Sequence, residues 1–179
     1  MRRGAFVGMV AIACVAGAAR ADGPARYSAA PLGFEYPNGW KAEPASDVSA
    51  ELAVRLTPPA GKRPPVSSLL VLVGAKKLSE ADLDTEAAGW HAAHVKNRAA
   101  WGMKSDGGLP RDVTRLGSRR LVRYRDKVGS ALGANEQTLA CATISGRLAC
   151  VIAAADPEVR DDADALIATI LSTLSVKKK

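Results

Sequence analysis

The stretch that most constrains this chain is Gln137–Ala154, which reads QTLACATISGRLACVIAA. Two apolar runs flank Ser145-Gly146, a dipeptide typical of the two-residue turn of a β-hairpin. Pairing outward from this turn places Cys141 opposite Cys150 in a non-hydrogen-bonded pair, where opposing side chains come closest. The register therefore predicts a disulfide between Cys141 and Cys150, although cross-strand bridges are often strained.

The first residues are typical of a secretory signal peptide. Two arginines precede Gly4–Ala19, an uncharged run shorter than the roughly 20 apolar residues that a membrane span needs. Ala19-Arg20-Ala21 is an A-x-A cleavage site, so we expect a signal peptide over residues 1–21, cleaved between Ala21 and Asp22. The alternatives are an uncleaved anchor and a lipoprotein attached through Cys14, whose lipobox lacks the usual leucine.

Cleavage would change the cysteine count and the charge. Cys14 would be lost, which leaves the two hairpin cysteines as an even number in an oxidising compartment. Loss of three arginines would reduce the 25 basic residues to 22 against 18 acidic residues, a net charge of +4. Three of these charges belong to a basic tail, residues 177–179, so the composition does not favour nucleic acid as a partner.

Hydrophobic periodicity and turn residues divide the rest of the chain. Residues 22–31 are expected to be a flexible leader, residues 57–65 a proline-rich loop, residues 101–117 an irregular segment and residues 127–136 a polar connection. Strands are predicted at 32–36, 48–56, 66–73, 119–125, 137–144 and 147–154, and helices at 79–100 and 157–174. The first helix is expected to have Ser79 as its N-cap and Asp82 as the reciprocal acid.

This order predicts an α+β fold. The strands at 66–73 and 147–154 are apolar on both faces, so both faces of the sheet must be covered. The simplest packing is an α/β/α sandwich, an antiparallel sheet of about six strands with helices on both faces.

The stretch Phe34–Trp40, FEYPNGW, resembles the opening motif "YP-x-GW" of the PsbP-like family, which includes DcrB-like envelope proteins and Ran-binding relatives. Residues 146–151 are similar to the family's "gr-x-y-x-l" strand, residues 170–176 to its closing helix and apolar tail, and residues 117–121 loosely to a "G-x-x-a" strand start. The resemblance covers residues 32–176. It implies an α/β/α accessory domain that binds or assembles and does not catalyse, and no metal-ligand set of the photosynthetic members can be transferred by position.

A cluster on the predicted first helix is the candidate ligand cleft: Trp90, His91 and His94, with Trp101 just after it. The two histidines, at i and i+3, could share a metal ion, but no third ligand is placed. The alternative is that they are boundary positions of a helix packed beside Trp90.

No catalytic constellation is recognisable in the sequence. Both histidines lie on one helix, no Gly-x-Ser-x-Gly elbow exists, and the cysteines are better explained as a disulfide than as nucleophiles. No phosphate-binding loop is present either. We therefore predict that the protein is not an enzyme, and we assign no catalytic residue, metal site or cofactor.

The segment Arg111–Lys127 is strongly basic, and Arg119, Arg123, Arg125 and Lys127 would share one face of a strand. One interpretation is a solvated edge strand that uses positive charge to block edge-to-edge pairing. The other is a docking strip for an acidic partner or anionic envelope lipid.

Together these observations predict a secreted or periplasmic accessory protein that binds a protein partner or envelope component, with at most peripheral membrane contact. A small-ligand or metal-binding protein is the main alternative. The resemblance also allows an immunity or secretion-adaptor role, and the sequence leaves the oligomeric state open.

Overall fold

The computed structural model describes residues 23–60, 66–100, 102–130 and 133–177. The predicted signal peptide, its cleavage site at Ala21 and Asp22, the lipobox cysteine Cys14 and Trp101 lie outside the described residues. Of the basic tail, only Lys177 is described.

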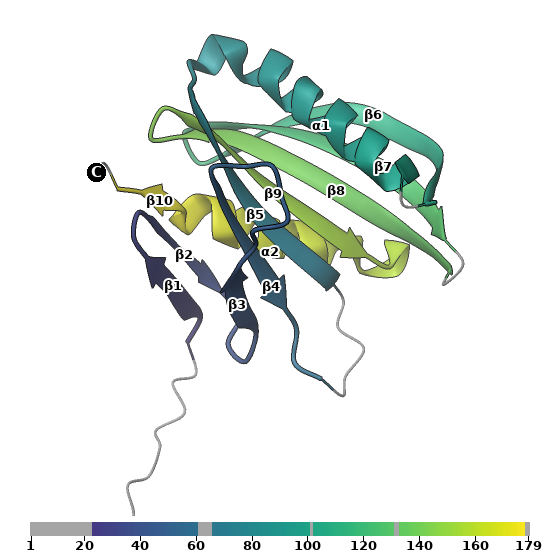
Figure 1. The fold of residues 1–179 in the computed structure, drawn as a ribbon, viewed down its shortest axis with the longest axis horizontal. Helices are drawn as coiled ribbons and strands as arrows, with labels where there is room; N and C mark the ends of the chain where they lie inside the picture. Colours follow the sequence, from purple (N-terminus) through teal and green to yellow (C-terminus); the bar gives the residue numbers. More distant parts are fainter. Residues whose placement is uncertain (1–22, 61–65, 101, 131–132, 178–179) are drawn as a thin grey trace, which may run out of the picture.

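A seven-stranded antiparallel sheet forms the centre of the molecule (Figure 1). In spatial order its strands are β3 (Lys41–Pro44), β4 (Leu52–Thr57), β5 (Val66–Lys77), β9 (Arg147–Ala155), β8 (Gly133–Ile144), β7 (Arg119–Ser130) and β6 (Lys104–Leu116). The α+β class is confirmed, and the sheet is one strand larger than expected.

A second, three-stranded sheet has the order β1 (Ala25–Ala29), β2 (Leu32–Tyr36) and β10 (Ser175–Val176). The prediction of a flexible leader is therefore wrong for Ala25–Ala29, which pairs antiparallel with β2. The Tyr27 ring stacks on Phe34 with centroids 5.2 Å apart. This cross-strand contact stabilises the pairing of a segment that is short and mostly polar.

The two helices lie on opposite faces of the large sheet, as the sandwich requires (Figure 1). α1 (Leu83–Ala100) packs over β6 to β9 on one face, and α2 (Arg160–Thr173) packs on the other face between β9 and β2. Alternation along each central strand divides its side chains between two cores: Val71 of β5 lies in the α2 core and Leu72 in the α1 core. Within the described residues, no helix combines the length and apolarity needed to cross a bilayer.

The central hairpin has the predicted register. Cys141 is opposite Cys150, and a disulfide of 2.08 Å joins them. Ser145 and Gly146 both have positive φ, as the tight turn requires. Both cysteines are fully buried in the α1 core, so the bridge fastens the part of the sheet that α1 covers.

Several strand limits differ from the sequence-based expectation. The segment predicted as irregular is β6, an edge strand whose register shifts between Ser105 and Gly108 and between Leu109 and Asp112. Such bulges let a strand accommodate glycine and proline. The predicted polar connection at 127–136 consists of the ends of β7 and β8, and β3 was not predicted.

The helices begin slightly later than predicted. Ser79 makes no side-chain hydrogen bond to the helix backbone; its Oγ donates to Oδ2 of Asp82 at 2.6 Å, and a 3-10 turn, Glu80–Asp82, precedes α1. The predicted capping box is therefore replaced by a bond between the two side chains.

Candidate functional site

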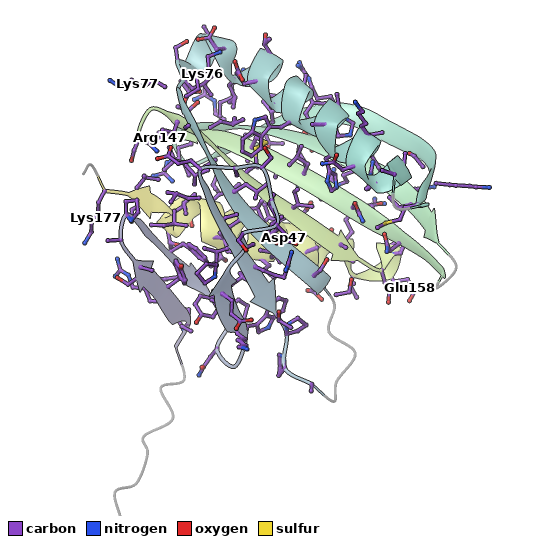
Figure 2. The ribbon with its side chains drawn as sticks, viewed as in Figure 1. Asp47, Lys76, Lys77, Arg147, Glu158 and Lys177 are labelled. Atoms are coloured by element: carbon purple, nitrogen blue, oxygen red, sulfur yellow. A yellow bond between two sulfur atoms is a disulfide. The ribbon has the colours of Figure 1, made fainter. Side chains whose placement is uncertain are left out.

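A cavity of about 510 Å³ lies between α1, the sheet and the connection from β3 to β4. Figure 1 shows this connection crossing the same face of the sheet that α1 covers, and Asp47, labelled in Figure 2, belongs to it. The volume is within the range of small-molecule pockets, roughly 300–1,000 Å³. The molecule thus has a partly open cavity that could hold a ligand.

Strand register organises the floor of the cavity into rows. One row runs across the sheet from Leu139 through Ile152 to Leu70 and is aliphatic. The next row runs from Gln137 through Ala154 to Ser68 and carries polar groups. The floor therefore changes from apolar to polar along the strands.

The α1 wall changes in the same direction. Trp90 lies over Gly74, where an added Cβ would come within 3.3 Å of the indole Cζ2. One and two turns later, His94, Asn97 and Arg98 line the cavity. A side chain at Gly74 would therefore press on the indole, which would have to shift by a few tenths of an ångström.

A buried hydrogen-bonded network closes the polar end. Arg98 is only 3% exposed, and its Nη2 donates to Oδ2 of Asp126 at 2.6 Å. Oε1 of Gln137 accepts from Nη1 of Arg98 at 3.2 Å and bonds to Nε2 of His94 at 2.9 Å. His91 contacts the same Asp126 oxygen through Nε2 at 2.8 Å and stacks on Tyr124.

The network sets the protonation of two of its members. Burial lowers the pKa of His94, and the hydrogen bond to Gln137 only partly opposes this effect, so the imidazole is neutral near pH 7. Burial by itself would raise the pKa of Asp126, but the hydrogen bonds from His91 and Arg98 hold this pKa below its usual value. The Arg98–Asp126 contact is therefore a pair of opposite charges.

At the mouth of the cavity, Arg55 Nη2 and Asp47 Oδ2 form an ion pair of 2.7 Å, with both side chains at least half exposed. This bond lowers the pKa of Asp47. Because the pair is solvated, it contributes little to stability, but it joins the β3–β4 connection to β4.

The predicted cleft residues are only partly brought together. Trp90 and His94 line the cavity, whereas His91 is not among its lining residues and bonds to Asp126. Each histidine has its Nε2 directed at a different protein oxygen, which does not fit a shared metal ion. Among the described residues, no group of three or more His, Cys, Asp or Glu side chains is close enough to hold a metal.

The predicted basic strip is an internal network. β7 pairs with β6 on one side and β8 on the other, so the edge-strand interpretation is wrong for the strand that holds the four residues of this strip; the edge strand is β6, which includes Arg111 and Arg115. Arg123 and Arg125 each reach Oδ2 of Asp164 on α2 at 2.5 Å, and both also contact Asp112. Arg119 Nη1 donates to the carbonyl oxygen of Leu171 at 2.6 Å, while Lys127 is exposed. The three arginines thus attach α2 to the sheet, and they do not form the open anionic-partner strip proposed from the sequence.

Sequence reasoning missed Arg98 and Gln137. A signal for Arg98 existed, because it follows His94 by four residues and His91 by seven and so shares their helix face. Alternation with Leu139 and Cys141 places Gln137 on the apolar face of its strand. A single amide on such a face needs a buried hydrogen-bond partner, which was the available signal. Nothing in the sequence indicated that Asp126 would face these residues.

No family model matches this chain, and no curated protein matches it. Among solved structures, it is similar to PsbP of the cyanobacterium Synechocystis sp. PCC 6803, with a TM-score of 0.57, 18% identity, and coverage of 96% of this chain and 98% of that one. It is also similar to a Bacteroides thetaiotaomicron protein, with a TM-score of 0.56 and 8% identity, over 83% of this chain and 46% of that one. The chain therefore has a PsbP-like fold.

Proposed function

We propose that this protein is a non-catalytic accessory protein of an extracytoplasmic compartment, and that the cavity beneath α1 is its binding site for a small molecule. The observation that carries the proposal is the cavity itself, which combines an aliphatic floor with a few convergent polar groups. This combination is typical of ligand sites. The PsbP-like fold supports an accessory role.

Two features support export. The amino-terminal sequence is typical of a signal peptide, and the buried cysteines form a disulfide, which persists in oxidising compartments. Edman or mass analysis of the exported protein is expected to find Asp22 as its first residue. A protein that retains Met1 would contradict this part of the proposal.

The binding site is tested by blocking the cavity. Ala93 of α1 is exposed and lines the cavity, whereas the neighbouring Ala92 is also exposed and is not among the lining residues. We expect Ala93→Trp to place an indole across the opening of the cavity and to weaken binding of the fluorescent probe anilinonaphthalene sulfonate at least ten-fold, as followed by its emission.

Ala92→Trp is the matched control, since it adds the same side chain to the same helix turn outside the cavity. It should bind the probe as the wild type does. The proposed site would be contradicted if both variants lost probe binding or if neither did. It would also be contradicted if the folded wild type did not bind the probe.

A further inference from the structure

We propose that the ligand is an amphipathic carboxylate, whose head group lies at the Arg98–Gln137 end of the cavity and whose apolar body extends toward Trp90 and Leu72. This inference rests on the proposed function, because it assigns a ligand class to the same cavity. It follows from three features of the described residues: the charge that faces the cavity, the orientation of one amide, and the aliphatic opposite end.

The charged side chain that lines the polar end of the cavity is a cation, Arg98. The Arg98 side chain is almost fully buried and lines the cavity, whereas its counter-ion Asp126 is not among the lining residues. The two groups form a short pair whose cationic partner is on the cavity side. A buried guanidinium favours acceptor groups, and carboxylates above all.

The Gln137 amide has a defined orientation. Its Oε1 receives the Arg98 Nη1 donor and contacts His94 Nε2, so this atom is the acceptor and the other amide atom is the NH₂ group. Gln137 also lines the cavity. The side chain can therefore present N–H donors to a ligand beside the guanidinium.

The opposite end suits an alkyl or similar apolar body. The floor there consists of Leu70, Leu139 and Ile152, followed by Leu72, and Trp90 lies above. Burying each methylene of a ligand in such surroundings raises affinity about four-fold. A chain that spans the apolar end would then bind far more tightly than a short acid with the same head.

The test compares ligands that share one ten-carbon chain: decanoate, decanol and decylammonium. Each is used to displace anilinonaphthalene sulfonate from the full exported protein. We expect decanoate to displace the probe best, and decylammonium to displace it about ten-fold less effectively or worse. Hexanoate, which is four methylenes shorter, should be roughly 250-fold weaker than decanoate.

A charge-changing variant locates the head group. Gln137→Glu keeps an acceptor for Arg98 and His94 but replaces the NH₂ donors with a second carboxylate oxygen. We expect it to weaken decanoate about ten-fold and to strengthen decylammonium, whereas Ala165→Glu, which adds the same charge at an exposed position on α2, should change neither.

The outcomes separate the two claims. The carboxylate assignment would be overturned if the three ten-carbon ligands displaced the probe equally or not at all. It would also be overturned if folded Gln137→Glu ranked the three ligands by affinity as the wild type does. In each case the cavity would remain a binding site. Failure of the probe itself to bind would overturn both.

Discussion

Arg98 is a costly residue for a fold to retain, because a buried guanidinium must be paired on several sides. Asp126 supplies the opposite charge and Gln137 supplies a neutral acceptor, while His91 contacts the same Asp126 oxygen that Arg98 does. A network in which each member is positioned by another keeps the polar end of the cavity fixed before a ligand arrives. Such preorganisation lowers the entropic cost of binding.

His94 gives the network a measurable pH dependence. Burial lowers its pKa below the ordinary value of 6.5, so the unfolded chain takes up this proton at a higher pH than the folded protein does. The free energy of unfolding should therefore fall as the pH drops below about 6.5. The loss attributable to His94 should grow as the pH is lowered further toward 5.

The pH dependence of the wild type's stability is compared with that of His94→Gln. The amide of this variant can still donate to Gln137 but does not titrate. Urea unfolding at about pH 7 and pH 5 should show a smaller decrease for this variant than for the wild type. Equal decreases would mean that His94 is not held neutral by its surroundings.

At the scale of secondary-structure elements, the hairpin of β8 and β9 could be predicted in detail because its signals are local. A two-residue turn fixes the register, and the register fixes which cysteines meet. β6 could not be predicted because its glycines and proline normally indicate a loop, and only pairing with β7 and two register shifts make it a strand. β1 depends likewise on a partner, β2, and on the stack of Tyr27 with Phe34.

The arginines of β7 show a related limit. Alternation correctly places Arg119, Arg123 and Arg125 on one face, but alternation does not say what covers that face. In the structure α2 covers it and supplies Asp164 and the Leu171 carbonyl oxygen. A charge pattern that suggested an external partner is used instead to hold two layers together.

The Cys141–Cys150 bridge makes a prediction for the same hairpin. Replacing both cysteines with alanine should lower the free energy of unfolding by about 3 kcal/mol, because the unfolded chain is no longer closed into a short loop. Urea denaturation of the variant and of the oxidised wild type measures the difference. An unchanged stability would mean that the buried hairpin gains nothing from the covalent link.

At the scale of the whole molecule, the layers explain why the cavity exists. α2 and the small sheet fill one face of the large sheet with large apolar side chains such as Phe34 and Ile167. On the other face, α1 lies over β6 to β9, and the β3–β4 connection forms the opposite wall. The sequence indicated both covering layers and two cavity residues, Trp90 and His94. It could not indicate the rest of the cavity, because the lining comes from five separated stretches of the chain.

The most direct test of this account is a chemical-shift map of the isotope-labelled protein titrated with decanoate. We expect the perturbed backbone amides to gather on the strands that form the floor, at Gln137, Leu139, Ile152 and Leu70, and along α1 from Trp90 to Arg98. Shifts concentrated on α2, the small sheet or β6, or no saturable shift at all, would contradict the claim that the cavity beneath α1 is the binding site.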